Sequence, residues 1–87
     1  MKSSGTNKFW RRYQALPVPV RELARKNYRL WMRDPRHPSL HFKKIGSVWS
    51  IRVGIGHRAL AIETAGGYCW IWIGSHADYD DLIGGQR

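Results

Sequence analysis

The side chains best suited to chemistry in this 87-residue chain are basic and aromatic, and they begin at residue 43. Guanidinium and ammonium groups can stabilise charge that develops on a phosphoryl oxygen. Histidine is the residue type whose unperturbed pKa suits proton transfer near neutral pH. For each residue alone an ordinary structural role is an equal alternative, but together they predict an anion-binding groove. The candidates are Lys43, Lys44, Arg52, Arg58, His76 and Tyr79.

Other kinds of site find little support in the sequence. His37 and His41 are four residues apart, but Pro38 lies between them and no HExxH motif, cysteine pair or paired carboxylates accompany them. No G-x-S-x-G nucleophile elbow is present. The glycines lie between expected strands and are typical of turns, not of a phosphate-binding loop before a helix. We therefore expect no metal site and no cofactor.

The charge of the chain is high and unevenly distributed. Lysine and arginine number 15 against 6 acidic residues, and residues 1–44 carry a net charge of +10 while residues 45–87 carry −1. Such asymmetry favours a polyanionic partner, either nucleic acid or an acidic protein, over an incidentally basic surface. Four arginines also recur at i+4 spacing, which predicts a stripe along a helix that either tracks phosphates or is simply solvated. They are Arg21, Arg25, Arg29 and Arg33.

Length and composition indicate a single small domain. Cys69 is the only cysteine, so no internal disulfide framework is possible. The longest apolar run, residues 68–73, is far shorter than the roughly 18 residues of a membrane span. The N-terminal residues lack the apolar region of a secretory signal. These features predict a cytoplasmic protein with no membrane partner.

Hydrophobic periodicity and turn residues predict the elements that position the candidates. Residues 1–6 are expected to be a flexible tail, with Thr6 as N-cap of a helix over 7–15 and Pro19 in the first turn of a second helix. Strands follow over 40–45, 48–53, 57–64 and 68–73, then a short helix over 76–83. The strand over 68–73 is apolar on both faces, which predicts the most central position. The fold class is α+β: an N-terminal helical hairpin packed on a four-stranded antiparallel sheet, with residues 7–87 as the domain.

Several segments give the chain a family resemblance. The segments 37–44 (HPSLHFKK), 49–53 (WSIRV), 57–61 (HRALA) and 72–79 (WIGSHADY), with FWRRY at 9–13, resemble the RelE/ParE family of bacterial type II toxins. The expected order of elements agrees with that fold. The resemblance implies a toxin with a neutralising antitoxin as its protein partner.

The resemblance also implies a reaction. RelE-type members are ribosome-dependent endoribonucleases that cut mRNA without a metal ion, by attack of a ribose 2′-hydroxyl on the adjacent phosphate. ParE-type members share the fold and poison DNA gyrase without catalysis. A small basic nucleic-acid-binding module without toxicity is a third alternative. mRNA and ribosomal RNA are the partners in the first hypothesis, which we rank highest.

Residue roles follow from the same resemblance. Arg58 and Arg52 would stabilise charge on the scissile phosphate, with Lys44 as an auxiliary charge. His76 would transfer protons and Tyr79 would orient the nucleotide. Lys43 and the arginines at 21, 25, 29 and 33 would contact nucleic acid. The acidic segment at 78–81 departs from this pattern, because acids beside a scissile phosphate are unfavourable unless one acts as a base.

Overall fold

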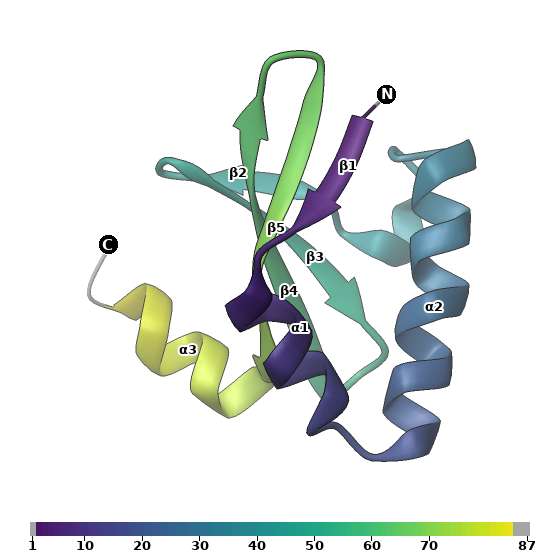
Figure 1. Ribbon diagram of the computed structural model, residues 1–87, viewed down its shortest axis with the longest axis vertical. Coiled ribbons are helices and arrows are strands. Elements are labelled where there is room, and N and C mark those ends of the chain that lie inside the picture. Colours follow the sequence, from purple (N-terminus) through teal and green to yellow (C-terminus); the bar gives the residue numbers. More distant parts are fainter. Residues whose placement is uncertain (1, 85–87) are drawn as a thin grey trace.

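Residues 2–84, which the computed structural model describes, form a five-stranded sheet with the strand order β1-β5-β4-β3-β2 and three α-helices (Figure 1). Strands β2 to β5 pair in antiparallel fashion, whereas β1 runs parallel to β5. A 3₁₀ turn precedes β2. The elements are β1 (Lys2–Gly5), α1 (Asn7–Gln14), α2 (Val18–Arg33), the 3₁₀ turn (Pro38–Leu40), β2 (Lys43–Ile45), β3 (Val48–Val53), β4 (His57–Thr64), β5 (Gly67–Ser75) and α3 (His76–Gly84).

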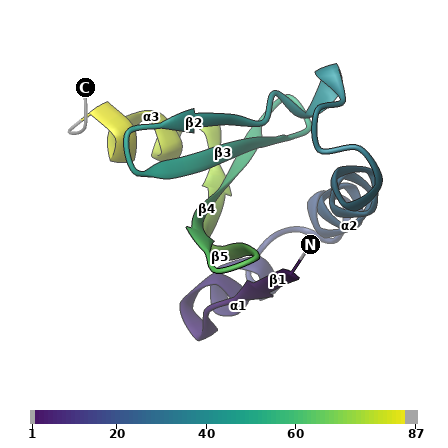
Figure 2. The same cartoon turned by 90° about the horizontal axis from the view of Figure 1, so that it is seen from above.

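The sheet is covered on both faces. Figure 2 shows α2 and α3 on opposite sides of the sheet, with α1 beside β1 and β5. Under α2 lies the larger apolar cluster, centred on the fully buried Trp31, whose ring lies 5.1 Å from that of Trp70. Under α3 lies a smaller cluster of Val48, Leu60, Tyr79 and Ile83. Burial of aromatic and branched side chains on both faces is the main favourable term in the stability of so small a domain.

The helices begin where the sequence predicts. The Thr6 hydroxyl accepts a hydrogen bond from the Phe9 amide at 3.1 Å, which confirms Thr6 as the N-cap of α1. Pro17 and Pro19 flank the start of α2, where a missing amide hydrogen costs nothing. Asn27 on α2 donates to the Arg52 carbonyl at 3.1 Å and so ties this helix to β3. The α+β class with its helical hairpin is confirmed.

The sheet itself corrects two expectations. Residues 2–5 form strand β1 and not a flexible tail, and the sheet is therefore five-stranded and mixed. The Lys2 amide donates to the Gly66 carbonyl at 3.0 Å, and the Thr6 amide donates to the Trp70 carbonyl at 3.0 Å. The segment KSSG has no apolar alternation, and its partner lies more than 60 residues away, so no local pattern indicated the pairing.

Two strand predictions also change. The strand expected over 40–45 is confined to Lys43–Ile45, because His41 adopts a left-handed conformation with φ 47° and interrupts the extended chain. The strand over 68–73 is not the central one, since β4 occupies the middle of the sheet. β5 is apolar on both faces because it lies between the two clusters and is paired on both sides along its first half.

Candidate active site

Two arginines stand directly opposite each other on the sheet face that α3 covers. The register pairs Arg52 on β3 with Arg58 on β4, so both side chains leave the same face. Like charges in this position repel each other. Within residues 2–84 the ion pairs found involve other side chains, so no carboxylate offsets either arginine. An anionic ligand would relieve this repulsion.

Arg58 is held by its neighbours and keeps an unused donor. Its Nη1 donates to the Ser50 hydroxyl at 3.2 Å, and its guanidinium carbon lies 5.0 Å from the centre of the Tyr79 ring. Its Nε is buried and has no hydrogen-bond partner among the described residues. A buried charged donor without a partner is costly. Ser50 is fully buried, and its hydroxyl orients Arg58.

Arg52 is fixed at the turn between β3 and β4. Its Nε donates to the Gly54 carbonyl at 3.2 Å, and its Nη1 lies 3.2 Å from His41 Nε2. The left-handed conformation of His41 places the imidazole there. These contacts use two of the five N–H donors of the guanidinium and leave three for a ligand beside Arg58.

His76 is the first residue of α3. The Tyr79 ring lies near both the His76 ring and the Arg58 guanidinium. The His76 amide donates to the Gly56 carbonyl at 2.8 Å, and its ring lies 5.9 Å from the Tyr79 ring, as the i, i+3 spacing predicts. Its Nδ1 lies 3.1 Å from Asp80 Oδ2. When Nδ1 carries the proton shared with Asp80, Nε2 presents a lone pair outward. The imidazole is 47% exposed, so a ligand can reach it.

Tyr79 occupies a different position from the one expected of a nucleotide-stacking residue. Its side chain is only 5% exposed and packs with Val48, Leu60 and Ile83. One face of its ring lies against Arg58. The residue therefore supports the arginine and joins α3 to the sheet.

The structure separates the two adjacent lysines. Lys44 pairs with Trp49 in the β2–β3 register and faces the α2 side, where its Nζ lies 3.9 Å from Glu63 Oε1. Lys43 pairs with Ser50 and shares the face of Arg52 and Arg58. Alternation along a strand puts neighbours on opposite faces, so Lys44, expected as an auxiliary charge, lies on the face away from Arg58, and Lys43 lies on the face of Arg58.

The arginine stripe of α2 faces α1 for part of its length. Arg21 Nη1 donates to the Gln14 carbonyl at 3.2 Å, and Arg25 Nε donates to the Tyr13 hydroxyl at 2.8 Å. The hydrogen bond to Tyr13 raises the pKa of the Arg25 guanidinium above its usual value. Arg29 and Arg33, further along, are exposed.

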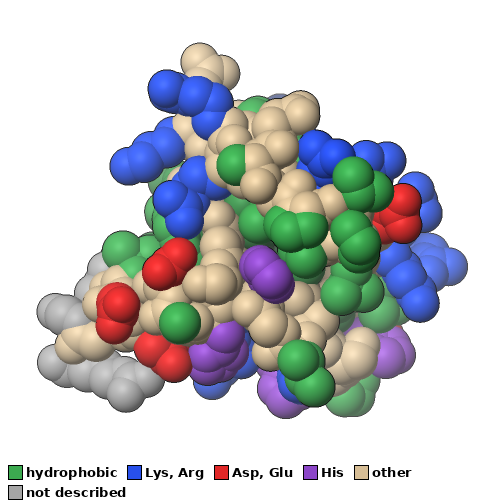
Figure 3. All heavy atoms as spheres, turned by 90° about the horizontal axis from the view of Figure 1, so that it is seen from below, with side chains coloured by type: hydrophobic (Ala, Val, Ile, Leu, Met, Phe, Trp, Pro, Cys, Tyr) green, Lys and Arg blue, Asp and Glu red, His purple; other side chains and the backbone are tan. Residues whose placement is uncertain are grey.

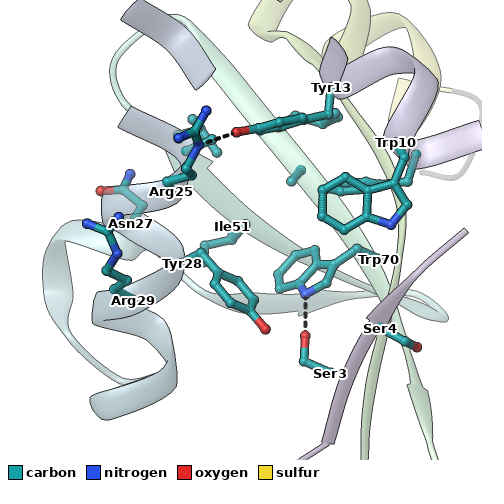
Figure 4. Close-up of a pocket in the computed structure, with 15 residues that line it drawn as sticks. Ser3, Ser4, Trp10, Tyr13, Arg25, Asn27, Tyr28, Arg29, Ile51 and Trp70 are labelled. Carbon is teal, nitrogen blue, oxygen red and sulfur yellow. Dashed lines mark hydrogen bonds between the residues drawn. The ribbon is translucent and has the colours of Figure 1, made fainter. Parts of the chain in front are cut away.

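A hollow of ≈ 270 Å³ lies between α1, α2 and the sheet, on the face away from Arg58 (Figure 4). Its walls are aromatic and apolar, and Trp10 and Tyr28 are exposed at 49% and 41%. The figure shows Arg25 bonded to Tyr13 on one side and Ser3 bonded to Trp70 on the other. The described residues that line the hollow include no histidine or carboxylate.

The charges around the candidate site are mixed. Figure 3 shows acidic side chains gathered next to histidine on one side of the molecule, with lysine and arginine elsewhere on the same face. The acidic side chains on α3 are Asp78, Asp80 and Asp81. Within residues 2–84 no group of three or more histidine, cysteine or acidic side chains could hold a metal ion. Over the same range, no helix has the length and apolarity needed to cross a membrane.

Three contributors to the site were missed in the sequence. Asp80 was treated as unfavourable, although its i, i+4 spacing from His76 is a recognisable signal for pairing. The contact of Ser50 with Arg58 could have been predicted from the register of β3 with β4. The contact of His41 with Arg52 could not, since it depends on one left-handed residue.

Comparison of the sequence with protein families and with curated proteins finds no match. Comparison with solved structures finds toxins. The RelB–RelE antitoxin–toxin complex of Methanococcus jannaschii matches with a TM-score of 0.70 at 14% identity, over 91% of this chain and 96% of that one.

Two further structures agree. The YoeB/ParE toxin of Agrobacterium tumefaciens matches with a TM-score of 0.68 at 21% identity, over 87% of this chain and 99% of that one. The isolated RelE toxin of E. coli matches with a TM-score of 0.64 at 14% identity, over 98% and 97% of the two chains. The chain therefore has the fold of the RelE and ParE toxins.

Proposed function

We propose that this protein is the toxin of a type II toxin–antitoxin system and that it inhibits translation by cutting mRNA on the ribosome, without a metal ion. The observation that carries the proposal is the register pair Arg52 and Arg58, which has no carboxylate partner within residues 2–84. The Tyr79 ring lies near both Arg58 and His76. The likeness to toxins of this fold supports the toxin role.

The proposed reaction divides into steps that these residues fit. The ribose 2′-oxygen loses its proton and attacks the adjacent phosphorus, the bond to the 5′-oxygen breaks, and that oxygen takes up a proton. The products are a 2′,3′-cyclic phosphate and a 5′-hydroxyl. Arg52 and Arg58 would bind the non-bridging oxygens and stabilise the charge added in the transition state.

In this proposal, His76 transfers the protons. The imidazole is exposed, and Asp80 binds Nδ1 and so orients the ring with Nε2 toward solvent. With Nδ1 held by Asp80, Nε2 could act as general base toward the 2′-hydroxyl or as general acid toward the leaving oxygen. Tyr79 would act indirectly, by holding Arg58 and the start of α3 in place.

The partners follow from the same proposal. Solved structures of this fold include RelB–RelE complexes, which supports an antitoxin as protein partner. mRNA and ribosomal RNA would be the nucleic-acid partners, and Lys43, Arg29 and Arg33 have exposed side chains that could contact them. Translation takes place in the cytoplasm, where the toxin would act.

Purified ribosomes loaded with a defined mRNA test the proposal. We expect cleavage within the codon in the decoding site, only when ribosomes are present, and RNA fragments that begin with a 5′-hydroxyl. His76→Ala should abolish the fragments, whereas His37→Ala, which changes the histidine at the N-cap of the 3₁₀ turn, should retain them. Absence of fragments together with inhibition of DNA gyrase in a supercoiling assay would instead support the ParE-like alternative.

A further inference from the structure

Arg12 on α1 reaches across the edge of β5. Strand β1 pairs with Gly67 to Trp70 of β5, and among the described residues 2–84 no strand lies beside the outer edge of β5 beyond Trp70. Arg12 Nε donates to the Ile73 carbonyl on that edge at 2.8 Å. Arg12 thus contacts the end of β5 that leads into His76, although it lies 61 positions from Ile73 in the sequence.

Gly74 provides the space for this approach. A Cβ atom at Gly74 would lie 2.8 Å from Arg12 Nη2 and 2.7 Å from Trp72 Cζ2, closer than real contacts allow. Gly74 is paired with Arg58, and Arg58 is paired with Arg52. Because directly paired residues share a face, the Arg12 guanidinium lies over the third position of the row that Arg52 and Arg58 begin.

The Arg12 side chain is held by a hydrogen bond and by an aromatic ring, and its terminal nitrogens make no hydrogen bond within residues 2–84. Its guanidinium carbon lies 5.0 Å from the centre of the Trp72 ring, in cation–π geometry. No acidic side chain within residues 2–84 forms an ion pair with it. A guanidinium fixed through Nε presents its Nη atoms as a fork, the geometry that binds phosphate oxygens through two hydrogen bonds.

We propose that Arg12 binds the phosphodiester adjacent to the one held by Arg52 and Arg58, and so positions single-stranded RNA along a row of three guanidinium groups. This inference rests on the proposed function and assigns Arg12 as a substrate-positioning residue, with Trp72 and Gly74 as its support. Binding of a flanking phosphate fixes the register of the strand relative to His76, which is how remote contacts accelerate a reaction. A carboxylate of a protein partner is the competing ligand, and the experiment separates the two.

The experiment measures binding of an oligoribonucleotide in which every 2′-hydroxyl is methylated, so that it cannot be cut. The protein is the full chain, in wild-type form and as Arg12→Gln, Arg12→Lys and the control Arg11→Gln. Arg11 is the exposed neighbour on α1 and undergoes the same change in charge. We expect Arg12→Gln to weaken binding about tenfold, as for loss of a charged hydrogen bond, and to lower the slope of log affinity against log salt by about 0.7.

Arg12→Lys should restore the salt slope but only part of the affinity, because an ammonium group keeps the charge and loses the fork. This pattern separates phosphate binding from a structural role, since misfolding would reduce affinity in both variants alike. Equal affinity of Arg12→Gln and Arg11→Gln would overturn the proposal, as would failure of the wild-type protein to bind the RNA. Loss of poly-glutamate binding in Arg12→Gln with RNA binding intact would assign Arg12 to a protein partner and also overturn it.

Cleavage assays keep the two proposals distinct. Arg12-dependent binding without any cleavage by the wild-type protein would support the inference and contradict the proposed nuclease. Cleavage that depends on His76, with Arg12→Gln indistinguishable from wild type in binding, would do the reverse.

Discussion

At the scale of single residues, the proposed proton transfer rests on His76, whose Nδ1 lies 3.1 Å from Asp80 Oδ2. General acid–base catalysis contributes about 10²–10⁴ in rate, so His76→Ala should slow RNA cleavage by that factor. The free energy of unfolding should change little, because the imidazole is 47% exposed. Asp80→Asn should cause a smaller loss, while the control Asp81→Asn retains activity. Rates from single-turnover cleavage and unfolding in urea provide the two measurements.

Tyr79 is a second prediction at this scale. Its ring is buried against Val48, Leu60 and Ile83 and supports Arg58. Tyr79→Ala should lower the free energy of unfolding by about 3–5 kcal/mol, as for other buried aromatic residues. Tyr79→Phe keeps the ring and should leave stability and cleavage close to wild type. Strong loss of cleavage by Tyr79→Phe in a fully stable protein would show that the hydroxyl contacts the substrate, contrary to our account.

The residues of the site were only partly predictable. Alternation along β3 correctly put Arg52 on the face opposite Trp49, and the i, i+3 spacing correctly put His76 beside Tyr79. The choice between Lys43 and Lys44 depends on the pairing of β2 with β3, and a shift by one residue reverses it. Burial of Ser50 and Tyr79 depends on where α3 packs, which periodicity does not specify.

At the scale of elements, the N-cap of α1 positions the helix that carries Arg12. The Thr6 side chain accepts from the Phe9 amide, and the Thr6 amide joins β1 to β5. Thr6→Ala removes the cap but keeps the backbone contact, so it should lower the free energy of unfolding by about 1 kcal/mol. Thr6→Ser retains the hydroxyl and is the matched control. Urea denaturation of the two variants checks the difference, and equal stability would contradict the role of the cap.

Elements with local signals were predicted well, and those that depend on distant pairing were not. Threonine marks the start of α1 and proline marks the start of α2. Glycine turns mark the hairpins around β4. β1 is a short polar segment that becomes a strand only because the edge of β5 is available to it. β2 is shorter than expected because His41 adopts a left-handed conformation, which its residue type did not indicate.

At the scale of the whole molecule, the charge asymmetry should govern affinity for RNA. Of the basic residues in 1–44, Arg12 lies beside the sheet row of Arg52 and Arg58, and the register puts Lys43 on the same face. With about three phosphates bound, a fourfold rise in salt should weaken binding of uncleavable RNA about 20-fold. Fluorescence titrations at several salt concentrations measure this slope. A binding constant that does not change with salt would contradict phosphate recognition by these arginines.

The central claim is that the Arg52–Arg58 pair and His76 form the site of a translation-dependent ribonuclease. Induced expression in a bacterium, followed by mapping of mRNA 5′ ends, tests it most directly. The account predicts growth arrest with new 5′ ends inside translated codons for the wild-type protein, and neither arrest nor new ends for His76→Ala produced in equal amount. Growth arrest without new ends, or new ends that persist in His76→Ala, would contradict it.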